Sequence, residues 1–125
     1  MRRRWLIVAV LWSTAVFIPG VLAHADLISA TPAPGSTVAA LTEIQLTFSE
    51  PVRPGGQILL HQDFVSAAVL ELAVDPANEK VLVTAVPPLP DGVYTVQWHV
   101  TSDDGHPISG SYSLGINARP TATET

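Results

Sequence analysis

The sequence contains no cysteine, and its only methionine is Met1. A disulfide therefore cannot stabilise the fold, and cysteine catalysis and thiolate metal sites are excluded. Once an N-terminal segment that includes Met1 is removed, no sulfur ligand of any kind remains, so soft ions such as Cu(I) lose their preferred partners. Any metal site in this chain must be built from nitrogen and oxygen donors.

Basic residues are also scarce. The chain has six lysines and arginines against eleven acidic residues, and three of the six are Arg2, Arg3 and Arg4 at the start. The rest of the chain has three basic residues (Arg53, Lys80 and Arg119) and all eleven acidic ones, a formal net charge of −8. Such a balance excludes nucleic acid as a partner and favours an acidic surface that attracts cations.

Long apolar runs are absent except for one, Trp5 to Val21, which follows the three arginines and precedes Val21-Leu22-Ala23. This order is typical of a secretory signal peptide, here residues 1–23, and cleavage after Ala23 would make His24 the first residue. The alternative is an uncleaved membrane anchor, because the run approaches the roughly 20 residues that span a bilayer. Pro19-Gly20 counts against the anchor. We expect a periplasmic, secreted or extracellular protein with no membrane span after processing.

Helical periodicity is missing from the remaining chain, which instead shows short alternating or β-branched runs separated by proline, glycine and aspartate. This rhythm predicts an all-β sandwich in one domain, residues 24–117, followed by a disordered tail, residues 118–125. The clearest run is 43–49, in which Ile44, Leu46 and Phe48 alternate with polar residues. The run 92–101 repeats this pattern and places on one face Tyr94, Val96, Trp98 and Val100. The expected strands number about seven: 26–29, 43–49, 57–61, 67–74, 80–86, 92–101 and 110–116.

A terminal His24 would be a ready-made chelate, because its α-amine and its imidazole can bind one metal ion together. Asp104-Gly105-His106 follows a predicted strand and should form an exposed turn in which a carboxylate and an imidazole converge. Three nitrogens and one oxygen suit Cu(II) best, with Zn(II) as the main competitor. The residues therefore favour a Cu(II) site made of His24, Asp104 and His106.

Four other residues are weaker candidates. Asp103 is an alternative ligand to Asp104, although we expect it to be solvated or to support the site from outside. His99 could orient a ligand, but its position on the polar face of a strand equally suits a surface residue. Asp26 is as well suited to capping a turn as to binding metal. His61 lies at a strand end, and without sulfur donors nearby it is best interpreted as an exposed histidine.

The segments SATPAPGS (29–36), LTFSEPV (46–52) and GVYTVQWHVTSDDGHPISG (92–110), together with the histidine start, resemble the copper-resistance CopC family. The resemblance implies an exported copper carrier with an immunoglobulin-like Greek-key β-sandwich. It also implies that His24, Asp104 and His106 bind one Cu(II) ion per chain. Some members bind Cu(I) through a methionine-rich segment, which this chain lacks, so a Cu(II)-only version is expected.

The leading hypothesis is therefore a non-catalytic Cu(II)-binding protein for copper resistance and homeostasis. We expect a monomer, and the resemblance suggests an inner-membrane copper transporter as a partner. One alternative is a copper-dependent oxidative enzyme, because a terminal-histidine copper centre resembles that of the copper polysaccharide monooxygenases. The other is a structural immunoglobulin-like module without metal, which the strand pattern fits equally well.

Overall fold

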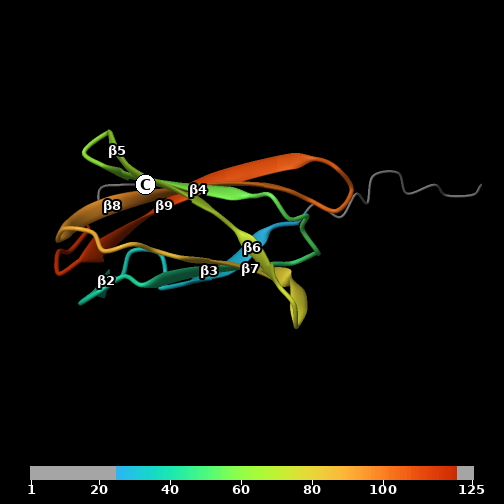
Figure 1. The fold of residues 1–125 in the computed structure, drawn as a ribbon, viewed down its shortest axis with the longest axis horizontal. Helices are drawn as coiled ribbons and strands as arrows, with labels where there is room; N and C mark the ends of the chain where they lie inside the picture. The colour runs from blue at the N-terminus through green and yellow to red at the C-terminus, as the bar shows by residue number, and fades with distance from the viewer. Residues whose placement is uncertain (1–24, 121–125) are drawn as a thin grey trace, which may run out of the picture.

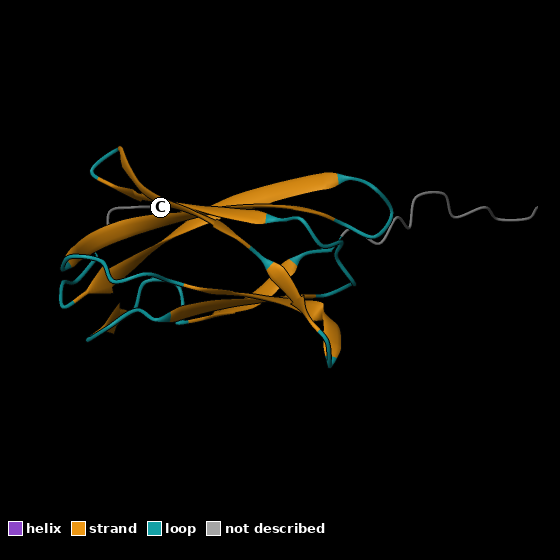
Figure 2. Cartoon of the chain, in the orientation of Figure 1, coloured by secondary structure: helices purple, strands orange, loops and turns teal. Residues whose placement is uncertain are grey.

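The computed structural model describes residues 25–120, and its secondary structure consists of nine strands joined by loops and turns (Figures 1 and 2). Their bounds are β1 Leu27–Thr31, β2 Thr37–Val38, β3 Glu43–Phe48, β4 Gln57–Gln62, β5 Val65–Glu71, β6 Ala73–Asp75, β7 Asn78–Ala85, β8 Gly92–Thr101 and β9 Pro107–Ile116. Within these residues no helix could span a membrane. The predicted signal peptide and His24 lie outside the described residues.

The strands form two sheets that pack face to face, with the order β1-β3-β7-β6 in one and β2-β9-β8-β4-β5 in the other (Figure 1). Neighbouring strands are antiparallel except for β2 and β9, which are parallel. The predicted all-β sandwich is confirmed. The described part contains nine strands rather than about seven, for two local reasons.

The first reason is that the expected strand 67–74 is divided between the sheets. Leu72 lies between β5 and β6, is 4% exposed, and donates its main-chain N–H to the carbonyl of Gly56 at 2.8 Å. β5 therefore stays beside β4 while β6 pairs with β7 in the other sheet. The second reason is β2, whose two residues are too few to produce an alternating pattern.

The core lies between the sheets and is built from alternate residues of β3 and β8. Ile44, Leu46 and Phe48 are completely buried, and the predicted inward face of β8 is buried as well. Phe48 of one sheet meets Trp98 of the other edge to face, with ring centroids 5.4 Å apart and planes at 74°. This contact joins the two sheets near the end of the sandwich where β3 and β8 finish.

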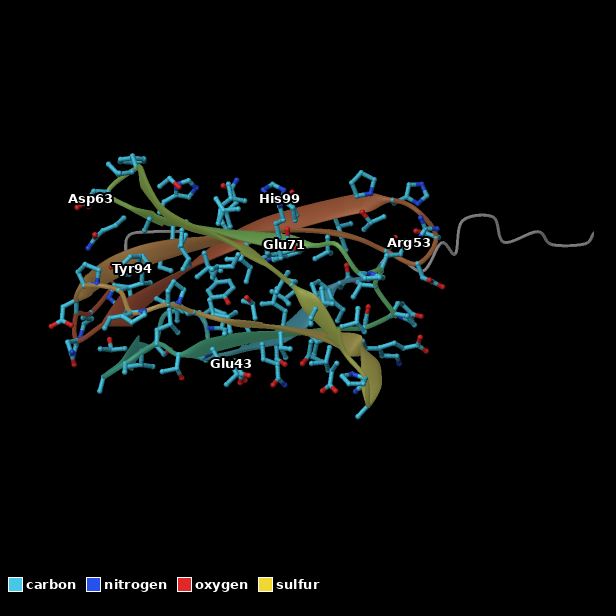
Figure 3. The ribbon with its side chains drawn as sticks, in the orientation of Figure 1. Glu43, Arg53, Asp63, Glu71, Tyr94 and His99 are labelled. Atoms are coloured by element: carbon cyan, nitrogen blue, oxygen red, sulfur yellow. The ribbon has the colours of Figure 1, made fainter. Side chains whose placement is uncertain are left out.

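Tyr94 joins the start of β8 to the loop that precedes it. Its ring is completely buried between the sheets, and its hydroxyl donates to the carbonyl of Pro90 at 2.6 Å (Figure 3). This arrangement has the form of the tyrosine corner found in immunoglobulin-like sandwiches. It lies at the end of the sandwich opposite to Arg53 (Figure 3).

Candidate metal site

The turn between β8 and β9, residues 102–106, is held by main-chain hydrogen bonds at the end of a long antiparallel pair. β8 and β9 are paired from Gly92 with Ile116 to Thr101 with Pro107. Ser102 donates its N–H to the carbonyl of His106 at 2.9 Å, and Gly105 donates to the carbonyl of Ser102 at 2.9 Å. Gly105 has φ +93°, a conformation that glycine adopts without strain. The predicted exposed turn is confirmed.

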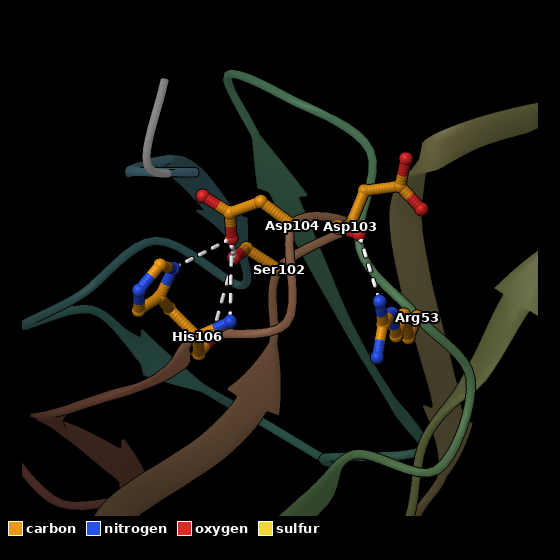
Figure 4. Close-up of polar contacts among 5 residues, drawn as sticks. All are labelled: Arg53, Ser102, Asp103, Asp104 and His106. Atoms are coloured by element: carbon orange, nitrogen blue, oxygen red, sulfur yellow. Dashed lines mark hydrogen bonds and ion pairs between the residues drawn. The ribbon is translucent and has the colours of Figure 1, made fainter. Parts of the chain in front are cut away.

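Asp104 and His106 converge within this turn (Figure 4). The Nδ1 atom of His106 lies 3.1 Å from Oδ1 of Asp104, and the main-chain N–H of His106 donates to the same oxygen at 3.2 Å. The side chains are 53% exposed for His106 and 31% exposed for Asp104. The spacing predicted this convergence, but a tight turn through Gly105 produces it rather than an extended segment.

The carboxylate of Asp104 is kept ionised by its hydrogen bonds. The hydroxyl of Ser102, which is 1% exposed, donates to Oδ1, and this bond is the largest cause that lowers the pKa of Asp104 from 3.8 to about 2. The hydrogen bond to the His106 side chain is the second cause. Asp104 is therefore an anionic oxygen donor across the ordinary range of pH.

Arg53 contacts the other side of the turn. Its main-chain N–H donates to the carbonyl of Thr101 at 2.8 Å, and its Nη2 donates to the carbonyl of Asp103 at 3.0 Å. Figure 4 shows the Asp103 carboxylate pointing away from Asp104 and His106. Of the two adjacent aspartates, Asp104 is therefore the one that faces the imidazole.

The start of the described chain lies at the same end of the sandwich as this turn (Figure 1). Ala25 is 2% exposed and belongs to the core, and Asp26 exchanges hydrogen bonds with Ser49, from its N–H to Oγ at 2.9 Å and from the N–H of Ser49 to its carbonyl at 2.8 Å. Two residues later, the carbonyl of Pro51 accepts the N–H of Asp103 at 3.2 Å. The residue that follows His24 is thus anchored at the end of the sandwich that carries Asp104 and His106.

Sequence reasoning missed the position of Glu50. It is half-buried and lies between Ser49 and Pro51, the two residues whose main chains connect Asp26 to Asp103. The sequence around Glu50 does not indicate this placement, because the placement depends on pairing between segments that are distant in the chain.

Among residues 25–120, no group of three or more histidine, cysteine or acidic residues is arranged to hold a metal ion. Asp104 and His106 form a pair and not a larger cluster within these residues.

The other two histidines among residues 25–120, His61 and His99, lie away from that pair. His99 is on the outer side of the five-stranded sheet (Figure 3), opposite Gln57 and Ser109, where it lines a shallow groove of about 250 Å³. His61 is opposite Thr95, six residues before Thr101, so about 20 Å of strand separates it from the turn. The structure brings neither of them to Asp104.

Together, these features define a two-sheet β-sandwich protein with an ionised carboxylate and an imidazole paired at one end, a donor combination suited to a divalent metal. A family model described as the CopC domain matches residues 27–117. This match covers most of the chain, and the chain belongs to the CopC family.

Curated relatives agree with this assignment. The chain is 33% identical over 106 residues to "Copper resistance protein C" of Escherichia coli, a match that covers 76% of this chain and 82% of the relative. It is 31% identical over 122 residues to "Copper transport protein CutJ" of Bacillus subtilis. The second match covers 92% of this chain but only 22% of that longer relative.

Solved structures show the same fold. The CopC structure from Methylosinus trichosporium OB3b superposes with a TM-score of 0.68 at 26% identity, over 74% of this chain and 92% of that one. The structure of PcoC of Escherichia coli, described as a methionine-rich copper resistance protein, superposes with a TM-score of 0.60 at 34% identity. This match covers 74% of this chain and 97% of PcoC. The CopC resemblance inferred from the sequence is therefore confirmed.

Proposed function

We propose that this protein is an exported, non-catalytic Cu(II)-binding protein that sequesters or carries copper for copper resistance and homeostasis. The observation that carries the proposal is the Asp104–His106 pair, held on one turn at the same end of the sandwich as Ala25. The names of the relatives support copper as the cargo.

The proposed ligand set binds one Cu(II) ion per chain. It consists of the α-amine and imidazole of His24 after processing, the imidazole of His106 and the carboxylate of Asp104. Three nitrogens and one oxygen form the tetragonal set that Cu(II) prefers, and Cu(II) stands at the top of the divalent affinity order. Figure 4 shows the second carboxylate oxygen of Asp104 pointing away from Ser102, so one oxygen faces outward while the other anchors the turn.

The oxidation state follows from the donors. Cu(I) prefers sulfur, and the sequence has no cysteine and a single methionine at position 1. This distinguishes the chain from PcoC, whose structure is described as methionine-rich. A carboxylate whose pKa is about 2 adds a permanent negative charge, which favours the higher oxidation state.

The proposed location is the periplasm or the cell exterior, and the proposed partner is a copper transporter of the inner membrane. The basic and apolar start of the sequence supports export. The match to CutJ supports the partner, because a segment like this chain is one part of that longer copper transport protein. We propose that the protein acts as a monomer and has such a transporter as its partner.

The proposal is tested by expressing the full chain, collecting the exported form, and titrating it with Cu(II) while recording its electron paramagnetic resonance spectrum. We expect one equivalent to bind with a signal from several nitrogen ligands. Asp104→Ala and His106→Ala should each weaken binding at least about tenfold, because each removes a ligand. The matched control is Asp103→Ala, since Asp103 contacts its neighbours through main-chain atoms. Equal binding by His106→Ala and the wild type would contradict the proposal.

A further inference from the structure

We infer that Arg53 is a positioning residue for the copper site: by holding the main chain on both sides of Ser102, it fixes the turn that presents Asp104 and His106. The inference rests on the proposed function and deepens it, because it explains what organises the site before the cargo arrives.

Arg53 makes two hydrogen bonds that bracket Ser102. The main-chain N–H bonds to the residue before it, Thr101, at 2.8 Å, and Nη2 bonds to the residue after it, Asp103, at 3.0 Å. The preceding residue, Val52, forms a β-bridge with Ser102 itself. The last residue of β8 and the first two residues of the turn are thus tied to the segment that follows β3.

Ser102 transmits this restraint to the site. Its side chain is buried, and its hydroxyl donates to Oδ1 of Asp104, the oxygen that also faces Nδ1 of His106. Movement of the main chain at Thr101 or Asp103 would displace this hydroxyl and release the carboxylate. The hydrogen bonds of Arg53 go to Thr101 and Asp103, so it acts on Asp104 through Ser102.

The guanidinium also lies against the tip of the turn. Its two terminal nitrogens are 3.7 and 3.9 Å from the point that a Cβ atom would occupy at Gly105. Figure 4 shows Arg53 on the side of the turn away from the imidazole of His106. It can restrain the turn from this side without filling the space where Asp104 and His106 meet.

The identity of the residue matters because few cations are available. Residues 25–120 contain three basic side chains: Arg53, Lys80 and Arg119. The guanidinium of Arg53 donates to the main-chain carbonyl of Asp103, although Asp103 also has a carboxylate. A planar guanidinium has several donors in a fixed fork, whereas an ammonium is a flexible point charge. A site organised in advance binds more tightly because less conformational entropy is lost on binding.

The experiment compares the wild type with Arg53→Met, Arg53→Lys and the control Arg119→Met, whose arginine lies at the far end near β2. In the metal-free proteins, the exchange rate of the Gly105 amide is measured by NMR. We expect Arg53→Met to raise it about fivefold, the equivalent of one hydrogen bond, with no change at Ile44 in the core. The exchange rate in Arg53→Lys should lie between those of the wild type and Arg53→Met, and the rate in Arg119→Met should equal that of the wild type.

The second readout is Cu(II) itself. Arg53→Met should weaken Cu(II) binding about fivefold and split the single paramagnetic resonance species into two or more, because Asp104 is no longer held in one place. Arg53→Lys should again lie between the two, with a smaller loss of affinity and a smaller fraction of the additional species than Arg53→Met. Failure of the wild type to bind Cu(II) would refute the proposed function, while the Gly105 amide would still test Arg53.

Two results would overturn the inference. One is Arg53→Met with unchanged exchange at Gly105 and an unchanged copper spectrum. The other is faster exchange throughout both sheets in both Arg53 variants, which would make the arginine a general stabiliser of the fold.

Discussion

At the scale of single residues, the position of the Asp104 carboxylate depends on the buried hydroxyl of Ser102, which the sequence alone does not identify. Ser102 is 1% exposed, and its hydroxyl donates to Asp104. We predict that Ser102→Ala raises the pKa of Asp104 above its present value of about 2, because the bond that lowers it most is removed. NMR titration of the side-chain carboxyl carbon checks this shift, and an unchanged pKa would show that the hydroxyl has no such role.

The same carboxylate predicts how stability changes with pH in the metal-free protein. The folded-state pKa of about 2 lies below the ordinary value of 3.8, so Asp104 contributes stability that is present above about pH 4 and is lost as the pH falls through about 2. We expect Asp104→Asn to be less stable than the wild type at pH 6 and the difference to disappear near pH 2. Urea unfolding at a series of pH values measures it, and a difference that grows in acid would have the wrong sign.

Release of copper in acid should, for the same reason, be governed by other groups. Asp104 remains ionised until about pH 2, so its protonation would not account for a loss of copper at higher pH.

How far the site could be predicted differs from residue to residue. Asp104 and His106 are two positions apart with a glycine between them, so their convergence was visible in the sequence. The contribution of Arg53 was not, because Arg53 is fifty positions away from Asp103 and pairs with the turn only in the fold. Ser102 is two positions from Asp104, but the residue type alone does not show that its hydroxyl is buried and donates to the carboxylate.

At the scale of elements, the hairpin between β4 and β5 contains an unfavourable residue at its tip. Phe64 has φ +65° and is fully exposed, and Asp63 before it also has positive φ. Two residues of positive φ in a two-residue turn favour Asp-Gly. We predict that Phe64→Gly stabilises the protein by about 0.5–1 kcal/mol. Glycine adopts the left-handed backbone conformation without strain, and the exposed Phe64 ring makes no packing contacts that would be lost. Chemical denaturation measures this, and destabilisation would contradict it.

The tyrosine of β8 offers a second test at this scale. Tyr94→Phe removes the hydrogen bond from the Tyr94 hydroxyl to the carbonyl of Pro90, so we expect a loss of about 0.5–1.5 kcal/mol in the free energy of unfolding. The matched control is Tyr112→Phe, because the hydroxyl of Tyr112 is buried without a hydrogen-bond partner within residues 25–120. That change should be neutral or stabilising. Equal losses in the two variants would show that the bond to Pro90 contributes nothing specific.

The strands themselves were predictable where one face is buried. The alternation of Ile44, Leu46 and Phe48 identified β3, and the same pattern identified β8. In such strands every second residue is buried and apolar, so the residue types alone reveal the pattern. The crossing at Leu72 was not predictable, since an apolar residue in an apolar run does not reveal that the chain changes sheets there.

At the scale of the whole molecule, the pairing of β1 with β3 and of Val52 with Ser102 brings the start of the described chain and the β8–β9 turn to one end of the sandwich. Eight strands separate Ala25 from Asp104 along the chain, yet the fold needs no movement to place them at the same end. The sandwich is thus suited to a site made from a processed terminus and a distant turn.

The most direct test is to measure the Cu(II) dissociation constant, by competition with a chelator of known affinity, for the exported chain and for a chain with one glycine added before His24. Mass spectrometry first establishes that the exported chain begins at His24. Because the added residue moves the free amine away from the imidazole, we predict one tightly bound Cu(II) in the first protein and an affinity at least about a hundredfold weaker in the second. Equal affinities, or an exported chain that begins at another residue, would contradict the account.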